Sequence, residues 1–513
     1  MTAAPLLPSR VLDETTPLLP SPTGNEQADK TVVRQKKPSP LFITTVAILW
    51  VLIIEFGDEL INPAQTRVFE SIYCQLYYKD HDPSVIGIEG HGGIAEKWCK
   101  IPVVQGQVAM LKGWQNTLNG IGMLLFSLPW GYFADVYGRR PTLFLVGLGF
   151  WLRSVYVQII CYFGLVVPLK LIWISSLHTL IGGSSSVAAA MIYTVISDVT
   201  PEEGRVTIFL RVQAASIATQ VGAPILSATL MNWNPWVPML SGVAIMAIPL
   251  LLVLYLPETL NYNAPETDSI ITSSSSSTIS TKSEHFVLKM VHTFSSSLSF
   301  LGSDIRILFI LPAFFLHMLI LNRDTLLQYI STRYAISIAS ATVLISVRSG
   351  LILFSLLLLL PALSYLLRHR LQLSSQKSDL ILAQGSTIIM GLGFLMIALA
   401  PTIPLLMVAM ALNSFGWGLT LFLRSLMTSL IEEHHIARLN TLVGVVDTIG
   451  FMTGSPFLAW AFGEGLELGG WRTGLPFLIC AGALAIVTIF QARLGIREDR
   501  DFQQADEDLA SGA

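Results

Sequence analysis

Apolar residues recur along this chain in long runs that are separated by short polar segments. A helix needs about 20 apolar residues to cross the roughly 30 Å hydrocarbon core of a bilayer. Twelve runs reach that length, and we expect a membrane helix in each. They lie near 41–61, 108–130, 142–163, 166–190, 206–231, 236–256, 306–328, 339–364, 380–400, 404–430, 439–462 and 473–493. Polar residues end the first run, and the tenth is long enough to predict a tilted or kinked helix.

The gap between the sixth and seventh runs divides the chain into two halves. It is polar and holds a run of serines after Thr272, which predicts a flexible linker without a core of its own. Six spans, a linker and six more spans predict two packed six-helix bundles related as a repeat. We expect a disordered cytosolic tail at 1–40, bundles at 41–257 and 305–494, a cytosolic linker at 258–304 and a cytosolic tail at 495–513.

Composition supports one membrane-embedded unit rather than several soluble domains. Hydrophobic residues make up 52% of the chain and charged residues 13%. A soluble domain carries about 25% charged residues. The net charge of −3 gives no reason to expect a nucleic-acid partner. The fold class is therefore an all-α membrane protein with a lipid bilayer around it.

Basic residues predict the orientation, because Lys and Arg concentrate in cytosolic loops. With the N-terminus in the cytosol, the cytosolic flanks hold many of them, whereas the opposite short loops near 164–168, 232–235 and 400–403 hold none. Both termini are therefore expected in the cytosol. The first loop, expected at about 62–107, is the long non-cytosolic one.

That first loop contains Cys74 and Cys99, the two cysteines outside apolar runs. Oxidation is possible on the non-cytosolic side of a membrane, so we expect a disulfide between them. The chain has no Asn-x-Ser/Thr sequence, and we expect no N-glycan.

The hairpin between the second and third runs carries a motif, Gly131-Tyr-Phe-Ala-Asp135-Val-Tyr-Gly138-Arg139-Arg140. Glycine permits close helix approach at Gly131 and a tight turn at Gly138. Asp135 can accept from helix N-terminal amides or from an arginine. The motif resembles the loop signature of the major facilitator superfamily, Gly-x-x-x-Asp-x-x-Gly-Arg-Arg/Lys. The resemblance implies a secondary transporter with twelve helices in two bundles.

The first helix resembles that of fungal members, which are similar to twelve-span drug:proton antiporters and, more distantly, to proton-coupled folate transporters. The residues that carry this resemblance are Glu55, Phe56, Gly57, Asp58, Pro63, Arg67, Glu70 and Cys74. Leu256-Pro-Glu258-Thr-Leu260 closes the sixth run as in many members. The antiporters' fifth-span motif, Gly-Pro-x-x-Gly-Gly, is only partly kept from Gly222 to Ala228. This departure leaves the direction of transport open.

Acidic residues inside apolar runs mark candidate functional sites, because each costs about 2.5–3.5 kcal/mol on insertion scales. Glu55 lies roughly 21 Å into the first span. Asp58 and Glu59 share its face, and like charges with little water favour a protonated carboxyl. We expect Glu55 to carry protons and Glu59 to lie in a solvated vestibule. Asp447, about 13 Å into the eleventh span, is either the rival proton carrier or the partner of an arginine.

Basic residues in the spans have two interpretations. Arg153, Arg211, Arg348 and Arg424 either pair with the acids or, where unpaired, bind an anionic or carboxylate-bearing substrate. Arg323 stands beside Asp324 late in the seventh run. For His178 we favour a packing role over proton transfer.

The first functional hypothesis is a proton-coupled transporter of small organic molecules that exports a secondary metabolite or toxic compound. The alternatives are proton-coupled uptake of an organic anion or nutrient, as by a folate carrier, and a non-transporting membrane sensor on the same fold. No Gly-Lys dipeptide, Gly-x-Ser-x-Gly or metal-ligand cluster occurs, which argues against a P-loop pump, an enzyme, a metal or a cofactor. The expected partners are substrate, protons and lipid, with the protein a monomer.

The N-terminal tail contains a candidate sorting signal, which concerns the membrane in which the protein is located. Its segment Glu14-Thr-Thr-Pro-Leu18-Leu19 resembles an acidic dileucine sorting signal. We expect the cell membrane, with the vacuolar or endosomal membrane as the alternative.

Overall fold

The computed structural model describes residues 39–87, 93–260, 305–320, 322–429 and 436–493. In these ranges the regular elements are helices, and no strand occurs. The predicted tails and the linker lie outside the described residues, except for 39–40 and 258–260. Their boundaries therefore stay predictions.

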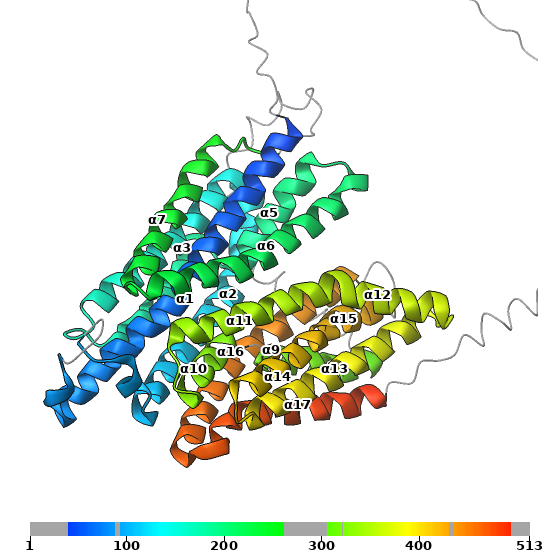
Figure 1. Cartoon of the computed structure of the whole chain (residues 1–513). Helices are drawn as coiled ribbons and strands as arrows, with labels where there is room; N and C mark the ends of the chain where they lie inside the picture. Colours follow the sequence, from blue (N-terminus) through cyan, green and yellow to red (C-terminus); the bar gives the residue numbers. More distant parts are fainter. Residues whose placement is uncertain (1–38, 88–92, 261–304, 321, 430–435, 494–513) are drawn as a thin grey trace, which may run out of the picture. The chain divides into compact units, whose positions relative to one another are not determined.

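The first half of the chain forms helices that pack around α1. They are α1 (Pro40–His81), α2 (Pro102–Tyr137), α3 (Arg139–Tyr162), α4 (Thr179–Gly182), α5 (Ser185–Val199), α6 (Glu202–Met231) and α7 (Trp236–Leu252). A 3₁₀ helix, Leu169–His178, leads into α4, and Gly183 with φ of 85° separates α4 from α5. Helix α1 contacts α5, α6 and α7 (Figure 1).

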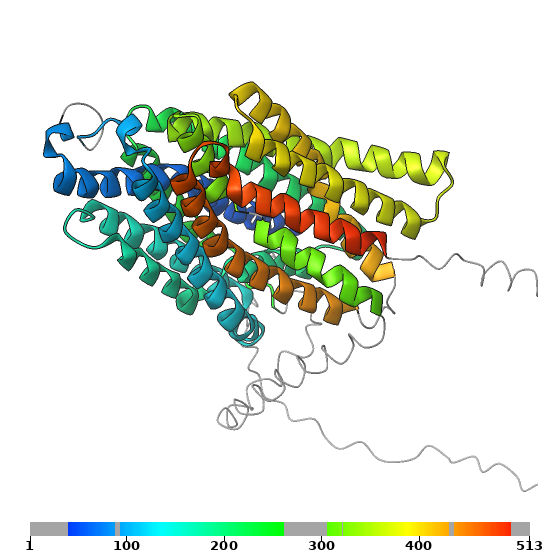
Figure 2. The same cartoon turned by 90° about the horizontal axis from the view of Figure 1, so that it is seen from below.

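The second half contains more broken helices. They are α9 (Ile305–Ile320), α10 (Arg323–Arg333), α11 (Ile338–Phe354), α12 (Leu360–Tyr365), α13 (Ser375–Leu399), α14 (Ile403–Phe415), α15 (Leu419–Ser429), α16 (Ile436–Leu468) and α17 (Leu475–Ala492). A 3₁₀ turn at Gly416–Gly418 separates α14 from α15, at the place of the long tenth run. Helix α17, red in Figure 2, packs against α9 and α13.

Ten helices in the described part are long and apolar enough to cross a membrane, or up to eleven if α9 and α10 form one span bent by 46°. Helix α2 is not among them, although its 36 residues would span about 54 Å. Polar side chains such as Gln115, Asn116 and Asn119 lower its hydropathy, and they line a cavity inside the protein. The run at 108–130 is thus a helix with a polar inner face.

The first helix is longer than the sequence predicts. We expected it to end at residue 61, but α1 has 42 residues and continues through Pro63 to His81. The first loop is therefore 82–101 rather than 62–107. Arg67 and Glu70, which fall within the range predicted for the loop, are buried and pair with each other at 3.1 Å. At 1.5 Å per residue α1 is about 63 Å long, so it extends beyond a 30 Å hydrocarbon core.

Two apolar clusters hold the helices together. One is confined to the first half and includes Trp50, Leu143 and Ile192. The other joins both halves and includes Phe69 of α1 and Phe462 of α16.

We call the side of the first loop, 82–101, the loop-1 end, and the side of residues 131–140 the signature end. First-half members of the joint cluster lie toward the loop-1 end, as in the stretch of α1 after Ala64 and the start of α2, so the halves share a core there.

Candidate substrate cavity and proton site

A cavity of about 530 Å³ lies between the two halves. Helices α1, α2, α3, α5, α9 and α16 contribute to its wall. Its charged residues are Asp58, Arg153 and Asp447, and Phe150, Met318 and Phe451 provide apolar surface. Most of the other lining residues are polar, among them Asn116, Asn119 and Ser184, so the wall can hydrogen-bond a small molecule as well as pack against it. Three of the charges that the sequence singled out therefore meet at one cavity.

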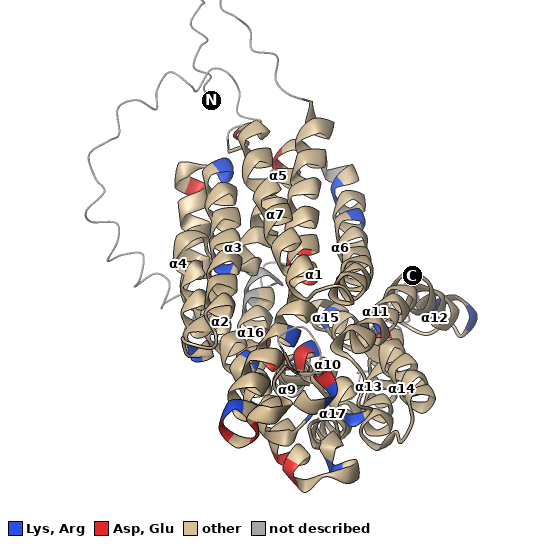
Figure 3. Ribbon diagram, turned by 60° about the vertical axis from the view of Figure 1, so that its left-hand side comes forward, with Lys and Arg blue, Asp and Glu red and all other residues tan. Residues whose placement is uncertain are grey.

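The acids of this cavity are paired with arginines. Arg153 of α3 donates to Asp58 of α1. Arg424 of α15 lies 3.5 Å from Asp447 of α16. Of the two interpretations given for Arg153 and Arg424, these pairs agree with the first, in which the arginines pair with acids. An ion pair offsets the cost of a charge inside a membrane. Figure 3 shows how few charged residues the helices carry and that several gather near α1 and α10.

Glu55 differs from the other acids. The hydroxyl of Ser216 on α6 donates to its carboxylate. Within the described part of the chain, Glu55 is the one partly or fully buried carboxylate that forms no ion pair. The like-charged cluster expected around it is neutralised, since Asp58 and Glu59 each contact an arginine. What distinguishes Glu55 is therefore the lack of a cation.

Glu59 corrects one expectation. We placed it in a solvated vestibule, but its side chain is only 18% exposed and pairs with Arg323 of α10 at 2.7 Å. Because α1 and α10 belong to different halves, this ion pair ties the halves together. The sequence pattern could not reveal a partner 264 residues away.

A second ion pair between the halves was not predicted from the sequence. Lys112 of α2 is buried, and its Nζ lies 2.7 Å from Oδ1 of Asp324 on α10. Asn62 and Thr66 of α1 also accept from this Nζ at 2.7 and 2.6 Å. Asn116 donates to the other oxygen of Asp324 at 3.2 Å. The sequence did contain a signal for it, because Lys112 lies inside the second apolar run. An ionisable side chain in such a run is a candidate functional residue, by the same argument that selected Glu55.

The remaining candidate arginines differ in environment. Arg211 on α6 is exposed. Arg348 on α11 is buried, and its Nη2 donates to Oδ1 of Asn413 on α14 at 2.9 Å. Its guanidinium carbon lies 5.2 Å from the ring centroid of Trp417. His178 is buried, with Nδ1 3.0 Å from the carbonyl oxygen of Ser175, and it is among the residues that line the cavity.

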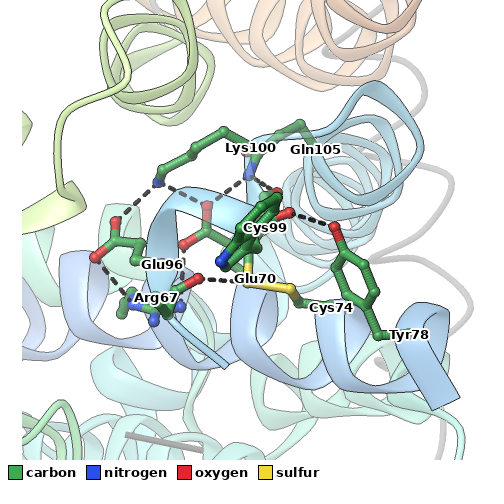
Figure 4. Close-up of a disulfide and its surroundings, with 10 residues drawn as sticks. Arg67, Glu70, Cys74, Tyr78, Glu96, Cys99, Lys100 and Gln105 are labelled. Atoms are coloured by element: carbon green, nitrogen blue, oxygen red, sulfur yellow. Dashed lines mark hydrogen bonds and ion pairs between the residues drawn. A yellow bond between two sulfur atoms is a disulfide. The ribbon is translucent and has the colours of Figure 1, made fainter. Parts of the chain in front are cut away.

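The first loop is fastened to α1 by a disulfide and an ion network (Figure 4). Cys74 of α1 bonds to Cys99 of the 3₁₀ helix Glu96–Cys99. Lys100 lies 2.7 Å from Glu70 and 2.8 Å from Glu96, and Arg67 lies 3.2 Å from Glu96. The network and the disulfide hold residues 96–100 against α1.

Glu96 also reaches the second half. Its carboxylate accepts from the backbone N–H of Ile338, in the first turn of α11, at 2.7 Å. Burial disfavours the charged carboxylate, but Lys100 and Arg67 outweigh burial and lower the pKa of Glu96. A lowered pKa means that Glu96 contributes stability at pH values above the ordinary carboxyl pKa. That contribution is lost only as the pH falls through the lowered value.

The signature residues lie at the opposite end of the first half. Arg139 bonds to Asp135 at 2.7 Å, and Gly138 has φ of 111°, which favours glycine. Glu258 accepts from the backbone N–H groups of Arg139 and Arg140 at 2.8 and 3.1 Å. The N-terminal amides of α3 are thus capped by Glu258 rather than by Asp135.

Gly131 corrects a second expectation. We predicted that it permits two helices to approach closely. Nothing lies within 4 Å of the place that a Cβ on Gly131 would occupy, so the structure contains no such contact. Close approach occurs instead at Gly113 of α2, where a Cβ would lie 3.0 Å from the Cα of Pro456 on α16.

The exposed Asp135 should matter for motion rather than for folding. We expect Asp135→Asn to slow substrate turnover while membrane insertion and substrate affinity stay near normal. An exposed ion pair contributes about 0–1 kcal/mol, so the unfolding temperature should hardly change. Transport rate and binding, measured on the same preparation, check this prediction. Glu467→Gln, at an exposed site on α16, is the control. A large loss of affinity with normal turnover would contradict it.

Contacts between the halves involve the loop-1 end. Ser331 and Ile338 contact Lys100 and Glu96 of the first loop. Deeper, Asp324 bonds to Lys112, and Thr117 donates to the carbonyl of Met452 at 2.8 Å. With the shared apolar cluster, these contacts close the cavity toward the loop-1 end. In the described residues no group of three His, Cys, Asp or Glu side chains could hold a metal ion.

Comparison with known proteins agrees with this architecture. The family model of the Major Facilitator Superfamily matches residues 106–455. The MFS-type transporter aprT of Aspergillus flavus is 32% identical over 486 residues, which cover 95% of this chain and 92% of that protein. The MFS efflux pump atnC of Emericella nidulans is 30% identical and covers 92% of this chain and 91% of its own. The chain belongs to the major facilitator superfamily and is a multi-pass membrane protein.

Solved structures show the same fold at low identity. A D-xylose-proton symporter matches with a TM-score of 0.59 and 15% identity, covering 90% of this chain and 99% of that one. The human organic anion transporter MFSD10 (TETRAN) matches with a TM-score of 0.54 and 16% identity, covering 89% of this chain and all of that one. At this identity the similarity concerns the fold alone.

Proposed function

We propose that this protein is a proton-coupled exporter of small organic molecules, such as a secondary metabolite or toxic compound. The observation that carries the proposal is the cavity of about 530 Å³ between the halves, closed toward the loop-1 end. If the signature end faces the cytosol, this conformation can load substrate from the cytosol. Relatives over most of the chain include the MFS efflux pump atnC and the efflux pump ustT of Aspergillus flavus, 28% identical over 84% of each chain.

Glu55 is the proposed proton carrier. An arginine partner favours the ionised form of a carboxylate, whereas Glu55 has a hydroxyl partner that can hydrogen-bond to either protonation state. Ser216 lies on α6 and Glu55 on α1, so movement between these helices could couple protonation to the transport cycle. Asp447 is the rival, and Arg424 favours its ionised form.

Inside-out vesicles test the direction of transport. In vesicles with an acidified lumen, we expect at least one compound of a fluorescent drug and metabolite panel to accumulate. A protonophore should abolish that accumulation, and vesicles without the protein should show none. Accumulation in right-side-out vesicles with acid outside would identify an uptake carrier instead.

We also propose that 258–304 is a cytosolic linker and that both termini are cytosolic. The basic-residue asymmetry and the serine run support this topology. Protease added to sealed right-side-out vesicles should leave the linker intact, whereas inside-out vesicles should be cut there. Cleavage from the outside would overturn the topology. The cell membrane is the proposed location, and a fluorescent fusion would distinguish it from the vacuolar membrane.

A further inference from the structure

Arg348 is a buried arginine in the second half whose positive charge has no carboxylate partner among the described residues. Its side chain is buried, with 6% of the residue exposed. Nη2 donates to Asn413, while Nε is buried without a hydrogen-bond partner. A guanidinium has five N–H donors, so much of its hydrogen-bonding capacity is left unused.

Comparison with the other buried cations makes the imbalance clear. Arg67 and Lys112 are also buried, and each lies within 3.1 Å of a carboxylate. Arg348 forms no ion pair with any carboxylate of the described residues. A buried charge without a counter-charge is strongly unfavourable, so an anion bound beside Arg348 would offset that cost.

A small cavity lies beside this guanidinium. Its volume is about 20 Å³, and Arg348, Trp417, Asn322, Arg323 and Met390 are among its lining residues. Such a volume admits about one water-sized group. Trp417 lies beneath the guanidinium, and Arg323 is already paired with Glu59. The cavity thus offers a net positive charge next to an aromatic ring and a flexible methionine.

We propose that Arg348 and Trp417, with Asn413 holding the guanidinium, form a site for a monovalent anionic group. The group is either the carboxylate of a transported compound or a free anion such as chloride. The guanidinium fork matches a carboxylate, and Met390 can move to admit the rest of an organic anion. The assignment to a transported compound rests on the proposed function, because it makes this site part of the transport pathway.

Calorimetry on the full-length protein in detergent tests the site, with sulfate as the only other small anion. The probes are 1-naphthoate, its uncharged analogue 1-naphthamide, and chloride. We expect naphthoate to bind about tenfold more tightly than naphthamide, and Arg348→Gln to remove that preference. If chloride binds and displaces naphthoate in an Arg348-dependent way, the anion is inorganic and the site stands. If neither anion binds, or Arg348→Gln leaves anion binding unchanged, the proposal is wrong.

A second variant guards against misfolding of Arg348→Gln. Asn413→Asp places a carboxylate beside Arg348, which should neutralise the guanidinium and weaken its attraction for an anion. We expect this variant to keep a wild-type unfolding temperature or exceed it, yet to lose anion binding. Unchanged anion binding in folded Asn413→Asp would also overturn the proposal. Because calorimetry needs no proton gradient, this result is independent of whether proton-driven export is found in vesicles.

Discussion

Replacing Glu55 by glutamine should abolish accumulation of substrate driven by a proton gradient. Glutamine keeps the size of the side chain and a hydrogen bond with Ser216 but cannot carry a proton. Exchange of substrate across the membrane needs no net proton transfer, so it should persist in the variant. Uptake into inside-out vesicles, with and without an acid lumen, measures both activities.

Two further variants make the Glu55 experiment specific. Glu464→Gln changes an exposed carboxylate on α16 and should leave gradient-driven transport intact. Asp447→Asn should mainly weaken substrate binding, because Asp447 lines the cavity, whereas its partner Arg424 is about half exposed. If Glu55→Gln still concentrates substrate against its gradient, the assignment fails and Asp447 becomes the proton carrier.

Replacing Lys112 by methionine should destabilise the protein by about 3–5 kcal/mol, the usual cost of removing one partner of a buried ion pair. The change leaves Asp324 inside the protein without its cation. The unfolding temperature in detergent, followed by tryptophan fluorescence, measures the loss. Lys170→Met, which removes an exposed lysine, should have little effect.

The double variant separates charge from packing. Lys112→Met combined with Asp324→Leu removes both charges, and we expect it to recover most of the lost stability, because an apolar pair of similar volume often replaces a buried ion pair without loss. If Lys112→Met alone unfolds at the wild-type temperature, the ion pair between Lys112 and Asp324 contributes little to the stability of the contact between the halves.

Helix positions were predictable from run length because a membrane span must be apolar over about 20 residues. The end of α1 was not predictable in this way. Arg67 and Glu70 lie beyond the apolar run, yet they are buried because Lys100 and Glu96, some 30 residues later, complete their network. Ion-pair partners that come from a distant segment depend on the fold, and the residues next to Arg67 and Glu70 do not indicate them.

The acids of the candidate site could be chosen from chemistry alone, but their partners could not. Asp58 and Arg153 are 95 residues apart, and Glu55 and Ser216 are 161 apart. Which acid remains unpaired is therefore a property of helix packing. Lys112 is different, because a lysine within an apolar run could have been selected by the rule that selected Glu55.

The contacts of the first loop with the second half have a consequence for leakage. For an exporter, compound already released outside faces a closed entrance, and the path reopens only when Glu96 and Lys100 release Ile338 and Ser331. In the proposed proton-driven export the medium outside is acidic, and the lowered pKa of Glu96 favours its charged form there. In the proposed exporter, these contacts would therefore limit back-flow of the exported compound through the protein.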